Sequence, residues 1–581
     1  MSDQRAELAT MFEQMAAMLD IQGADYHRVL AYRRAAETLR GLAEPLESLA
    51  QADHLELLPG IGVVFAEKIR EYLRTQTLSA YQTLSAQVPL GLLDLLQVPG
   101  VGPRKAALFW QALGITTFDE LEFAAQSGQL QQLKGVGART ERNVLEGLRA
   151  LQRQRRGRVP LAVAWPLAQE VVTALQSAPG VQQAAPVGSL RRMREMVGAL
   201  DILAAADDSE PALACFCALP VAVEVLQRST GRASIRTAEG LQIDLFVYPA
   251  ARWGSALLQF TGSRAHNVRL RALAQARGLT LSEYGLCDSA GGEQLYADEE
   301  SLYATLGLPW IPPELREDRG EIEAALVGQL PRLLQMADLR GDFQCHTTRS
   351  DGDHVLEEMA RAARAAGLSY LVVSDHTAGL GIVPGMQPEA LESLLAEVAA
   401  VNARLGDGFR VLAGAEVEIG PDGALDWPDP LLARLDFVIG SMHTGLNQPR
   451  AQLTTRLLTA LQNPYLDLIG HPTGRLLGRR DPADIDMEAV FRAARARGVA
   501  LEVSAWPLRL DLDDVYVRRA VELGVQLAIS SDAHDVDGFA VLPFGVAVAR
   551  RGWAEPHHLL NTHSWDEVRA WQRQRKTVRD L

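Results

Sequence analysis

Short apolar runs alternate with amphipathic stretches over residues 338–575 of the chain. Each run is rich in β-branched residues and ends at a turn, as in LVVSDHT, VLAGAEVE, FVIGSMHTG, LDLIGHPTG and LAISSDAH. The stretches between them are rich in Ala, Leu, Glu and Arg. Strand-length apolar runs that alternate with helical stretches are typical of parallel strands connected by helices. We therefore expect a β/α barrel, in which the C-terminal ends of the strands meet at one mouth.

Imidazole and carboxylate side chains stand at the ends of these runs. The set is His346, Asp351, His376, Glu416, His443, His471, Asp532 and His534. A single histidine at a strand end is more often a capping or core residue than a ligand. A series at successive strand ends would converge on the mouth, and Zn²⁺ and Mn²⁺ accept both ligand types. The pattern predicts a site for more than one divalent ion.

The first third of the chain repeats a second pattern. A short helix ends on an apolar residue, Gly-apolar-Gly follows, and a new helix begins, in residues 56–73, 95–113 and 132–148. The glycines are Gly60, Gly62, Gly100, Gly102, Gly135 and Gly137. Glycine permits φ > 0 and close backbone approach, so amide N–H groups at the start of the second helix can hold a phosphate oxygen. This helix-hairpin-helix pattern predicts DNA binding that ignores base sequence.

Charge supports DNA binding only locally. The net charge of −15 argues against a nucleic-acid partner. Residues 101–200, however, carry 13 Lys/Arg against 7 Asp/Glu, and Arg104, Lys105 and Arg139 directly follow two of the hairpins. A basic stretch is often only a solvated face, but here it coincides with the hairpins and permits DNA binding.

Length and composition describe a multidomain globular protein. A chain of 581 residues is too long for one hydrophobic core, and 48% hydrophobic with 22% charged residues is ordinary for a folded protein. No apolar run has the length of a membrane span, and the N-terminal segment is an amphipathic helix rather than a signal peptide. The cysteines form no CxxC pair and no disulfide framework. We expect a monomeric cytoplasmic protein with no membrane partner.

The middle of the chain predicts a nucleotide site. Residues 181–206 and 241–249 give a strand, a Gly-Ser turn, a basic helix start and then acids on strands. The candidates for cradling triphosphate oxygens and holding Mg²⁺ are Gly188, Ser189, Arg192, Asp201 and Asp244. This order is the plan of a nucleotidyltransferase palm.

Residues 338–575 resemble a PHP domain, a metal-dependent phosphoesterase that folds as a distorted β/α barrel with a trinuclear site. The resemblance runs through GDFQCHTTRSDG, SDH, AEVE, SMHTG, GHPTGRLLGRR and SDAH. The family begins with two histidines one residue apart, and the first of them is here Gln344. The resemblance implies up to three Zn or Mn ions, with the third weakened. It implies a bridging Glu416 and three ligand groups: His443 with His471; Asp351 with His376 and His534; and His346 with Asp532 near Gln344.

Residues 4–575 resemble a bacterial family X DNA polymerase, which is DNA polymerase beta-like, with a fused PHP domain. In the N-terminal domain the resemblance covers DYHRVLAYRRAAETL and AEKIREYL. It implies that His27, Arg28 and Tyr32 bind a 5′-phosphate at a gap, and that Lys68 forms a Schiff base with the sugar left after base loss. Such a nucleophile needs a lowered pKa; otherwise Lys68 only contacts phosphate or solvent.

The palm departs from the family pattern at one position. The family has Gly-Ser-x-Arg-Arg, two aspartates one residue apart and a third on a later strand. Asp201 matches the second and Asp244 the third, but Ala199 occupies the place of the first. Because that carboxylate bridges both ions in the family, we expect weak binding of Mg or Mn and gap-filling synthesis that is weakened or lost. Binding of dNTP would survive, and a nearby acid such as Glu195 would have to reach in to compensate.

Residues 253–286 resemble the thumb of the same family. The resemblance implies that Thr261, Gly262 and Ser263 form the turn under the incoming nucleotide. It also implies that Asn267 makes a minor-groove contact.

The expected fold class is multidomain, with α and α/β parts. The segments are a helix-hairpin-helix, lyase-like domain that binds gaps and 5′-phosphates (1–85), fingers with two further hairpins (86–157), an α+β nucleotidyltransferase palm (158–250), a thumb (251–317), a linker (318–337) and the PHP barrel (338–575).

Several functions stay open. The first is a DNA-repair enzyme, as in base-excision repair, that binds gapped or nicked DNA and trims it in the PHP domain as a 3′–5′ exonuclease or 3′-end phosphodiesterase. The others are a degenerate, non-catalytic DNA-end-binding scaffold and a working Mn-dependent gap-filling polymerase. A small-molecule phosphatase fits the barrel but not the DNA-binding modules. At the barrel mouth, LEVSAWP contains Trp506, which either stacks an unpaired base or narrows access.

Overall fold

The computed structural model divides into two compact units, Met1–Arg156 and Gly157–Leu581. It describes all residues except 1–3, 43–45, 53, 76, 90, 97, 99, 134, 138, 146–157, 289–290, 382–383 and 580–581. The expected boundary at residue 157 falls in a stretch outside the described residues. The finer domain boundaries stay a prediction.

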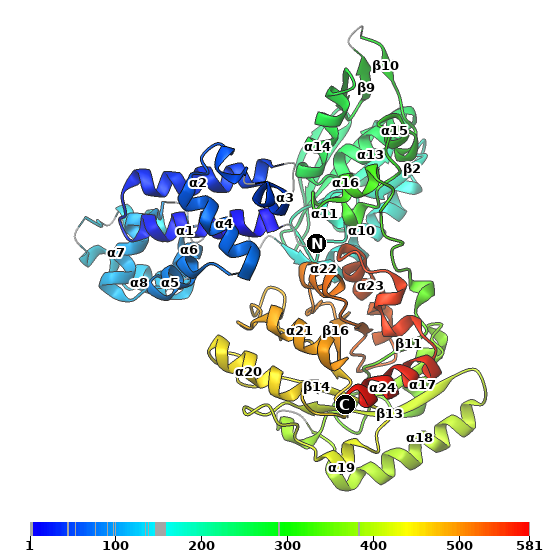
Figure 1. The fold of residues 1–581 in the computed structure, drawn as a ribbon. Helices are drawn as coiled ribbons and strands as arrows, with labels where there is room; N and C mark the ends of the chain where they lie inside the picture. Colours follow the sequence, from blue (N-terminus) through cyan, green and yellow to red (C-terminus); the bar gives the residue numbers. More distant parts are fainter. Residues whose placement is uncertain are drawn as a thin grey trace. The chain divides into compact units, whose positions relative to one another are not determined.

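The first unit is helical (Figure 1). Its helices are α1 (Gln4–Ile21), α2 (Tyr26–Gly41), α3 (Leu46–Gln51), α4 (Val63–Thr75), α5 (Ser79–Gln87), α6 (Gly91–Leu95), α7 (Pro103–Leu113) and α8 (Phe118–Gln126). Phe12 of α1, Tyr32 of α2 and Phe65 of α4 pack edge to face, with ring centroids 4.9–5.7 Å apart. This aromatic cluster joins the three helices, because each ring buries a large apolar area.

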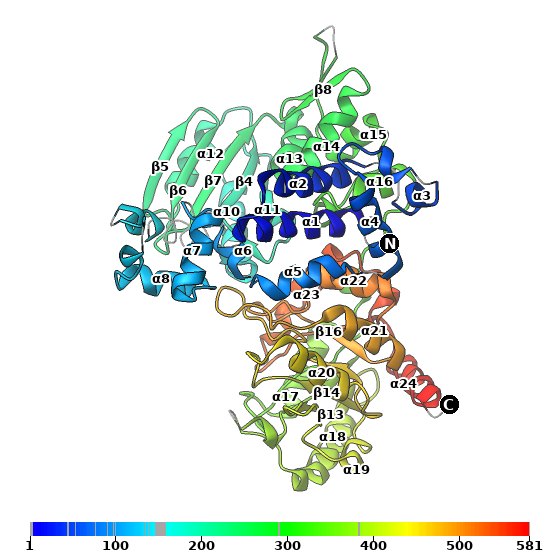
Figure 2. The same ribbon diagram turned by 60° about the vertical axis from the view of Figure 1, so that its left-hand side comes forward.

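The second unit begins with a five-stranded sheet. Its strands are β2 (Gln183–Pro186), β4 (Leu200–Ala205), β5 (Glu224–Ser229), β6 (Arg232–Arg236) and β7 (Gln242–Tyr248), in the order β2-β4-β7-β6-β5. Figure 2 shows β5, β6, β7 and β4 side by side. Short strands β1 (Val159–Pro160) and β3 (Met196–Val197) pair nearby, and the helices are α10 (Leu161–Gln176), α11 (Gly188–Arg191) and α12 (Glu210–Cys217). Strands β4 and β7 are parallel, and their register puts Asp201 beside Asp244.

Both faces of this sheet are covered. Leu200 and Ile202 of β4 belong to one hydrophobic cluster and Leu203 to another, as expected from the alternation of side chains along a strand. The second cluster includes Trp253 and Leu257 of the following helix, α13 (Trp253–Thr261). The alternation therefore places Asp201 on the α13 face of the sheet.

The segment after the sheet is a small α+β layer with its own core. It contains α13, α14 (Arg264–Gln275), α15 (Glu299–Thr305), α16 (Glu321–Leu326) and the antiparallel strands β8 (Leu279–Ser282), β9 (Gly285–Asp288) and β10 (Glu293–Gln294). Leu258, Leu270 and Tyr303 lie in its core. Glu299 is buried there as well and accepts hydrogen bonds from Arg191 and Arg316.

Seven parallel strands form a nearly closed barrel, which confirms the expected fold class. They are β11 (Gly341–Asp342), β12 (Tyr370–Val373), β13 (Arg410–Glu418), β14 (Phe437–Ser441), β15 (Leu468–Ile469), β16 (Ala500–Ser504) and β17 (Leu527–Ser530), in sequence order. A parallel bridge between Cys345 and Ala533 joins the ends of the first and last strands. Inside the barrel, Phe343, Phe437 and Leu468 cluster with Trp565.

Helices surround the barrel strands (Figure 1). They are α17 (Leu356–Ala365), α18 (Leu391–Leu405), α19 (Asp429–Leu432), α20 (Arg450–Ala460), α21 (Met487–Arg497), α22 (Asp514–Leu523), α23 (Leu542–Arg551) and α24 (Trp565–Arg579). Strands covered by helices outside and by a packed interior are apolar throughout, which explains their continuous hydrophobic runs. Over the part of the chain that the structure describes, no helix is both long and apolar enough to cross a bilayer.

Candidate metal centre, palm site and DNA-binding hairpins

The eight imidazole and carboxylate candidates lie at the C-terminal ends of the barrel strands. His376 follows β12, His443 follows β14 and His471 follows β15, whereas Glu416 lies within the long strand β13. The ligand atoms of seven of them fall into three groups, within each of which the atoms are at most 4.8 Å apart, and His471 lies beside these groups, 3.1 Å from Glu416. Parallel strands bring side chains from distant parts of the sequence to one edge, as the sequence pattern predicts.

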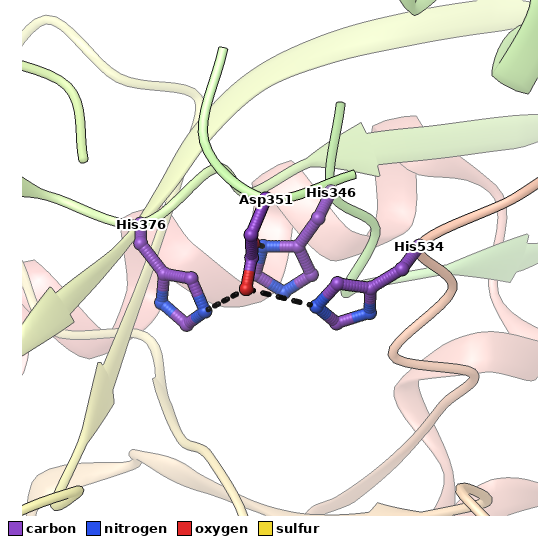
Figure 3. Close-up of side chains that lie close together, drawn as sticks. All are labelled: His346, Asp351, His376 and His534. Atoms are coloured by element: carbon purple, nitrogen blue, oxygen red, sulfur yellow. Dashed lines mark ion pairs between the residues drawn. The ribbon is translucent and has the colours of Figure 1, made fainter. Parts of the chain in front are cut away.

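The first group has Asp351 at its centre (Figure 3). The Asp351 carboxylate lies 3.7 Å from Nε2 of His376, 3.5 Å from Nε2 of His534 and 3.8 Å from Nδ1 of His346. The side chains come from the loop after β11 and the ends of β12 and β17. Nitrogen and oxygen atoms that face each other at 3.5–3.8 Å are of the types that coordinate Zn²⁺, and a cation between them would contact all four side chains.

The second and third groups share Glu416, a buried carboxylate. Its oxygens lie 3.1 Å from Nδ1 of His376, 3.1 Å from Nε2 of His471, 3.4 Å from Nε2 of His443 and 3.4 Å from Nε2 of His346. One carboxylate thus contacts imidazoles from both sides of the mouth. A position of this kind suits a ligand that bridges two ions.

Gln344 lies at the edge of the third group, beside Asp532. Its amide nitrogen donates to Oδ1 of Asp532 over 3.3 Å, and the same oxygen lies 3.1 Å from Nε2 of His346. The amide oxygen of Gln344 is buried and has no hydrogen-bond partner among the described residues. Where the family resemblance leads us to expect an imidazole, the structure thus has a buried amide oxygen without a hydrogen-bond partner among the described residues.

Electrostatics at the mouth favour positive charge. Burial would raise the pKa of Glu416, but the imidazoles of His376 and His443 outweigh it and hold the pKa well below its usual range. His346 is fully buried, and its Nε2 faces the carboxylates of Asp532 at 3.1 Å and Glu416 at 3.4 Å, while no hydrogen bond is formed by Nδ1 among the described residues. A buried polar atom without a hydrogen-bond partner is costly unless something coordinates it. The donor set and the orphaned atoms together fit divalent cations.

Two buried acids behind the ligands escaped the sequence analysis. Glu418 accepts a hydrogen bond from Nδ1 of His443 over 2.7 Å, and Glu502 accepts one from the backbone N–H of His471. Glu418 fixes the orientation of the His443 ring, as outer carboxylates do for metal-binding histidines. Its signal in the sequence was the second acid of AEVE, two residues after Glu416.

In the palm, the two remaining aspartates lie side by side. Burial, and then the neighbouring Asp244 carboxylate, raise the pKa of Asp201 to about 6. Asp244 accepts hydrogen bonds from Ser234 and Gln242. Gly188 has φ +64°, and a Cβ there would lie 2.5 Å from Oδ2 of Asp201. The Gly-Ser turn and the carboxylates are thus adjacent, which is the arrangement that a nucleotide site requires.

The carboxylate of Glu195 does not take the place of the aspartate that is missing at position 199. Both oxygens of Glu195 accept from Arg475 of the barrel, at 2.7 and 3.3 Å. The carboxylate is therefore turned to the barrel in an ion pair rather than to the palm aspartates.

The residues expected beneath the nucleotide are gathered, but they make internal contacts. Arg192 pairs with Glu317 at 3.0 Å and donates to the carbonyl of Thr261 at 2.6 Å. Ser263 caps α14 by accepting from the N–H of His266, and Asn267 donates to the carbonyl of Gln259. A Cβ at Gly262 would lie 3.2 Å from Nη1 of Arg192. Arg192 differs from the expectation, since its charge is already paired.

The three hairpins share one backbone geometry. Gly60, Gly100 and Gly135 have φ of +76°, +88° and +87°. The carbonyls of Gly62, Gly102 and Gly137 accept the first hydrogen bonds of the helices that follow, from residues three and four positions on. Arg104 and Arg139 are exposed at these helix starts, and Lys105 donates to the carbonyl of Gly100. Each hairpin therefore presents a glycine turn at a helix N-terminus, the backbone form that binds phosphate.

The lyase candidates divide into exposed and buried residues. His27 and Arg28 are exposed on α2, and Lys68 is half-buried on α4. Tyr32 differs, because it is only 6% exposed and packs between Phe12 and Phe65. The family resemblance grouped it with His27 and Arg28, but its ring packs in the aromatic cluster.

Three family models match this chain. They are a helix-hairpin-helix domain over residues 3–78, a SAM-like helix-hairpin-helix tandem over 92–150 and a DNA polymerase beta thumb over 256–317.

Known proteins match both the whole chain and parts of it. The DNA polymerase/3'-5' exonuclease PolX of Bacillus subtilis is 34% identical over 570 residues, which cover 98% of this chain and 99% of that protein. A protein named "Probable phosphatase" from Thermoanaerobacter sp. is 30% identical over 204 residues, covering 33% of this chain and 78% of its own. DNA polymerase lambda of Rattus norvegicus is 26% identical over 336 residues, which cover 52% of this chain and 55% of that protein.

The hairpins, the thumb and the barrel together define a DNA-binding enzyme of the DNA-repair type, a polymerase with an exonuclease- or phosphatase-like barrel attached. The chain belongs to the family X DNA polymerases, in the group of the Bacillus subtilis DNA polymerase/3'-5' exonuclease PolX.

Proposed function

We propose that the barrel is the active site of this protein and acts as a metal-dependent 3′–5′ exonuclease or 3′-end phosphodiesterase. The observation that carries this proposal is Glu416, a buried carboxylate within 3.4 Å of four imidazole nitrogens. We propose the substrate to be gapped or nicked DNA, held by the hairpins of a monomeric protein. The metal would be Zn or Mn, at up to three positions.

Divalent ions in this centre would supply Lewis-acid stabilisation of the charge that develops on the phosphodiester oxygens. Glu416 would lie between two ions; His443 and His471 would serve one, and Asp351, His376 and His534 the other. His346 and Asp532 would hold the third position, with the Gln344 carbonyl oxygen as a weaker ligand than imidazole. Water oxygen adds to phosphorus and the bond to the 3′ oxygen of the preceding nucleotide breaks, so the products are a nucleoside 5′-monophosphate and a shorter strand with a 3′-hydroxyl.

We further propose that gap-filling synthesis is weakened or lost. Asp201 and Asp244 would hold Mg or Mn only weakly, because no carboxylate stands at position 199 and Glu195 is paired with Arg475. Gly188 and Ser189 with Thr261, Gly262, Ser263 and Asn267 would still accept a dNTP. The roles of His27, Arg28 and Lys68 at a 5′-phosphate stay a prediction.

The test is shortening of 5′-labelled gapped DNA in Mn²⁺ by wild type, His376→Ala and Asp244→Ala. Shortening that is lost in His376→Ala and retained in Asp244→Ala supports the proposal. Bound but unshortened DNA in all three proteins would replace it with the non-catalytic scaffold. Shortening retained in His376→Ala would assign the activity to a different site.

A further inference from the structure

The loop after β16 exposes an aromatic side chain at the barrel mouth. Of the nine tryptophans, all among the described residues, Trp506 alone is exposed, at 37%. Strand β16 lies between β15 and β17, which lead into His471 and Asp532. The indole therefore emerges beside the strand ends that carry metal-ligand candidates.

An arginine accompanies this indole. The guanidinium carbon of Arg509 lies 5.4 Å from the centroid of the Trp506 ring, within cation–π distance. Nε of Arg509 is buried and has no hydrogen-bond partner among the described residues. Arg509 and Trp506 belong to the same loop between β16 and α22, and the neighbouring strands β15 and β17 lead into His471 and Asp532.

The loop that carries the pair is held in place. The N–H groups of Arg509 and Leu510 donate to the carbonyl of Trp506 at 2.8 and 3.0 Å, and Ser504 accepts from the N–H of Trp506. Arg475, only 5% exposed, donates to the carbonyls of Arg509 and Leu510. The pair is therefore preorganised, and binding a ligand would cost little ordering of the loop.

Fold stability alone does not explain this pair. More than a third of the Trp506 side chain is exposed to solvent, and a buried guanidinium N–H without a partner is costly. A nucleotide is complementary to this pair, because its planar base can stack on the indole and its phosphate can accept hydrogen bonds from the guanidinium.

We propose that Trp506 and Arg509 form a subsite for the unpaired 3′-terminal nucleotide, with the indole stacked on the base and the guanidinium on the backbone phosphate. The subsite rests on the proposed exonuclease function and names its preferred substrate, a single-stranded or frayed 3′ end. A base in a duplex is already stacked and paired, so it reaches the indole only after it is released.

The test places 2-aminopurine at the 3′ terminus of a single-stranded oligonucleotide and measures its fluorescence on the full-length protein in EDTA. Protein is added until the anisotropy of a 5′-fluorescein label no longer changes. We expect quenching in wild type and in Trp506→Tyr, which keeps an aromatic plate, and loss of quenching in Trp506→Leu. Equal quenching in wild type and Trp506→Leu would overturn the subsite.

A second readout is selectivity between mismatched and paired 3′ ends. The ratio of kcat/KM for the two ends should fall about tenfold in Trp506→Leu, the size expected for one stacked base. An unchanged ratio would also overturn the subsite. Quenching that depends on Trp506 without any shortening by wild type would remove the exonuclease proposal and leave the nucleotide subsite, so the two failures are distinguishable.

Discussion

At the scale of single residues, the departures from the family pattern at Gln344 and Ala199 differ in kind. Gln344 keeps an oxygen donor in the ligand position and contacts Asp532. Ala199 removes a carboxylate, and the nearby Glu195 is held by Arg475. A weakened ligand lowers the occupancy of one ion, whereas a missing bridging carboxylate leaves two cations unscreened. The barrel is therefore expected to keep its activity and the palm to lose most of its own.

Replacing Gln344 by histidine should strengthen the third metal position. Imidazole binds Zn²⁺ better than a neutral amide does, and the position is buried beside His346 and Asp532. We expect the purified Gln344→His protein to carry up to one more ion per chain by elemental analysis. Gln344→Asn, which keeps the amide, is the control. Equal metal content in all three proteins would show that residue 344 is no ligand.

At the scale of elements, the hairpins depend on one backbone conformation. Gly100 has φ +88° with nothing near its Cβ position, and Gly102 caps α7 with φ −96°. Gly100→Ala should therefore destabilise the hairpin by about 1–2 kcal/mol through backbone strain alone. Gly102→Ala should lower the stability of the hairpin much less, because a methyl group fits there without strain. Hydrogen exchange of peptides spanning α7 measures the loss of stability in each variant. Equal protection of these peptides in the two variants would contradict the assigned backbone conformations of Gly100 and Gly102.

A buried ion cluster joins α11, α15 and the segment that follows α15. Glu299 is 2% exposed and pairs with Arg191 at 2.9 Å and with Arg316 at 2.6 Å. Burial would raise the pKa of Glu299, but Arg316 and then Arg191 hold it well below the ordinary range. A carboxyl with a lowered folded-state pKa stabilises above its unfolded pKa of roughly 4.3, and loses this effect as pH falls further.

Glu299→Gln should cost about 3–5 kcal/mol at pH 7, since it removes the carboxylate that neutralises the buried Arg316 and the half-buried Arg191. The difference from wild type should shrink as the pH is lowered below roughly 4. Denaturant unfolding of wild type and Glu299→Gln at a series of pH values measures this difference in the free energy of unfolding. A cost that stays constant between pH 7 and pH 3 would contradict the assigned ion cluster.

At the scale of the whole molecule, ion pairs join the palm, thumb and barrel within the second unit. Arg475 of the barrel pairs with Glu195 of the palm, and Arg551 pairs with both Glu317 and Asp514. Arg475 also fixes the loop with Trp506 and Arg509 at the metal mouth. The segment beside the palm aspartates is thereby connected to the loop at the barrel mouth.

The sequence predicts those features of the structure that leave a local, repeating pattern along the chain. Strand ends, glycine turns and ligand types recur locally, so the barrel, the hairpins and the convergence of His346, Glu416 and His471 follow from the pattern. The pairing of Glu195 with Arg475 joins residues 280 positions apart and leaves no local signal. The burial of Tyr32 between Phe12 and Phe65 likewise depends on helices α1 and α4, which the local sequence around Tyr32 does not show.

The central claim is that the barrel cleaves DNA while synthesis by the palm is weakened. The most direct test is one gel with a 5′-labelled primer opposite a one-nucleotide gap, in Mn²⁺, with and without dNTPs. Wild type should shorten the primer and hardly extend it, and Ala199→Asp should shorten it and also extend it, with Ala199→Asn as the control that adds no charge. Extension by wild type that disappears in Asp244→Ala would show that the palm works without its first aspartate and would contradict the account.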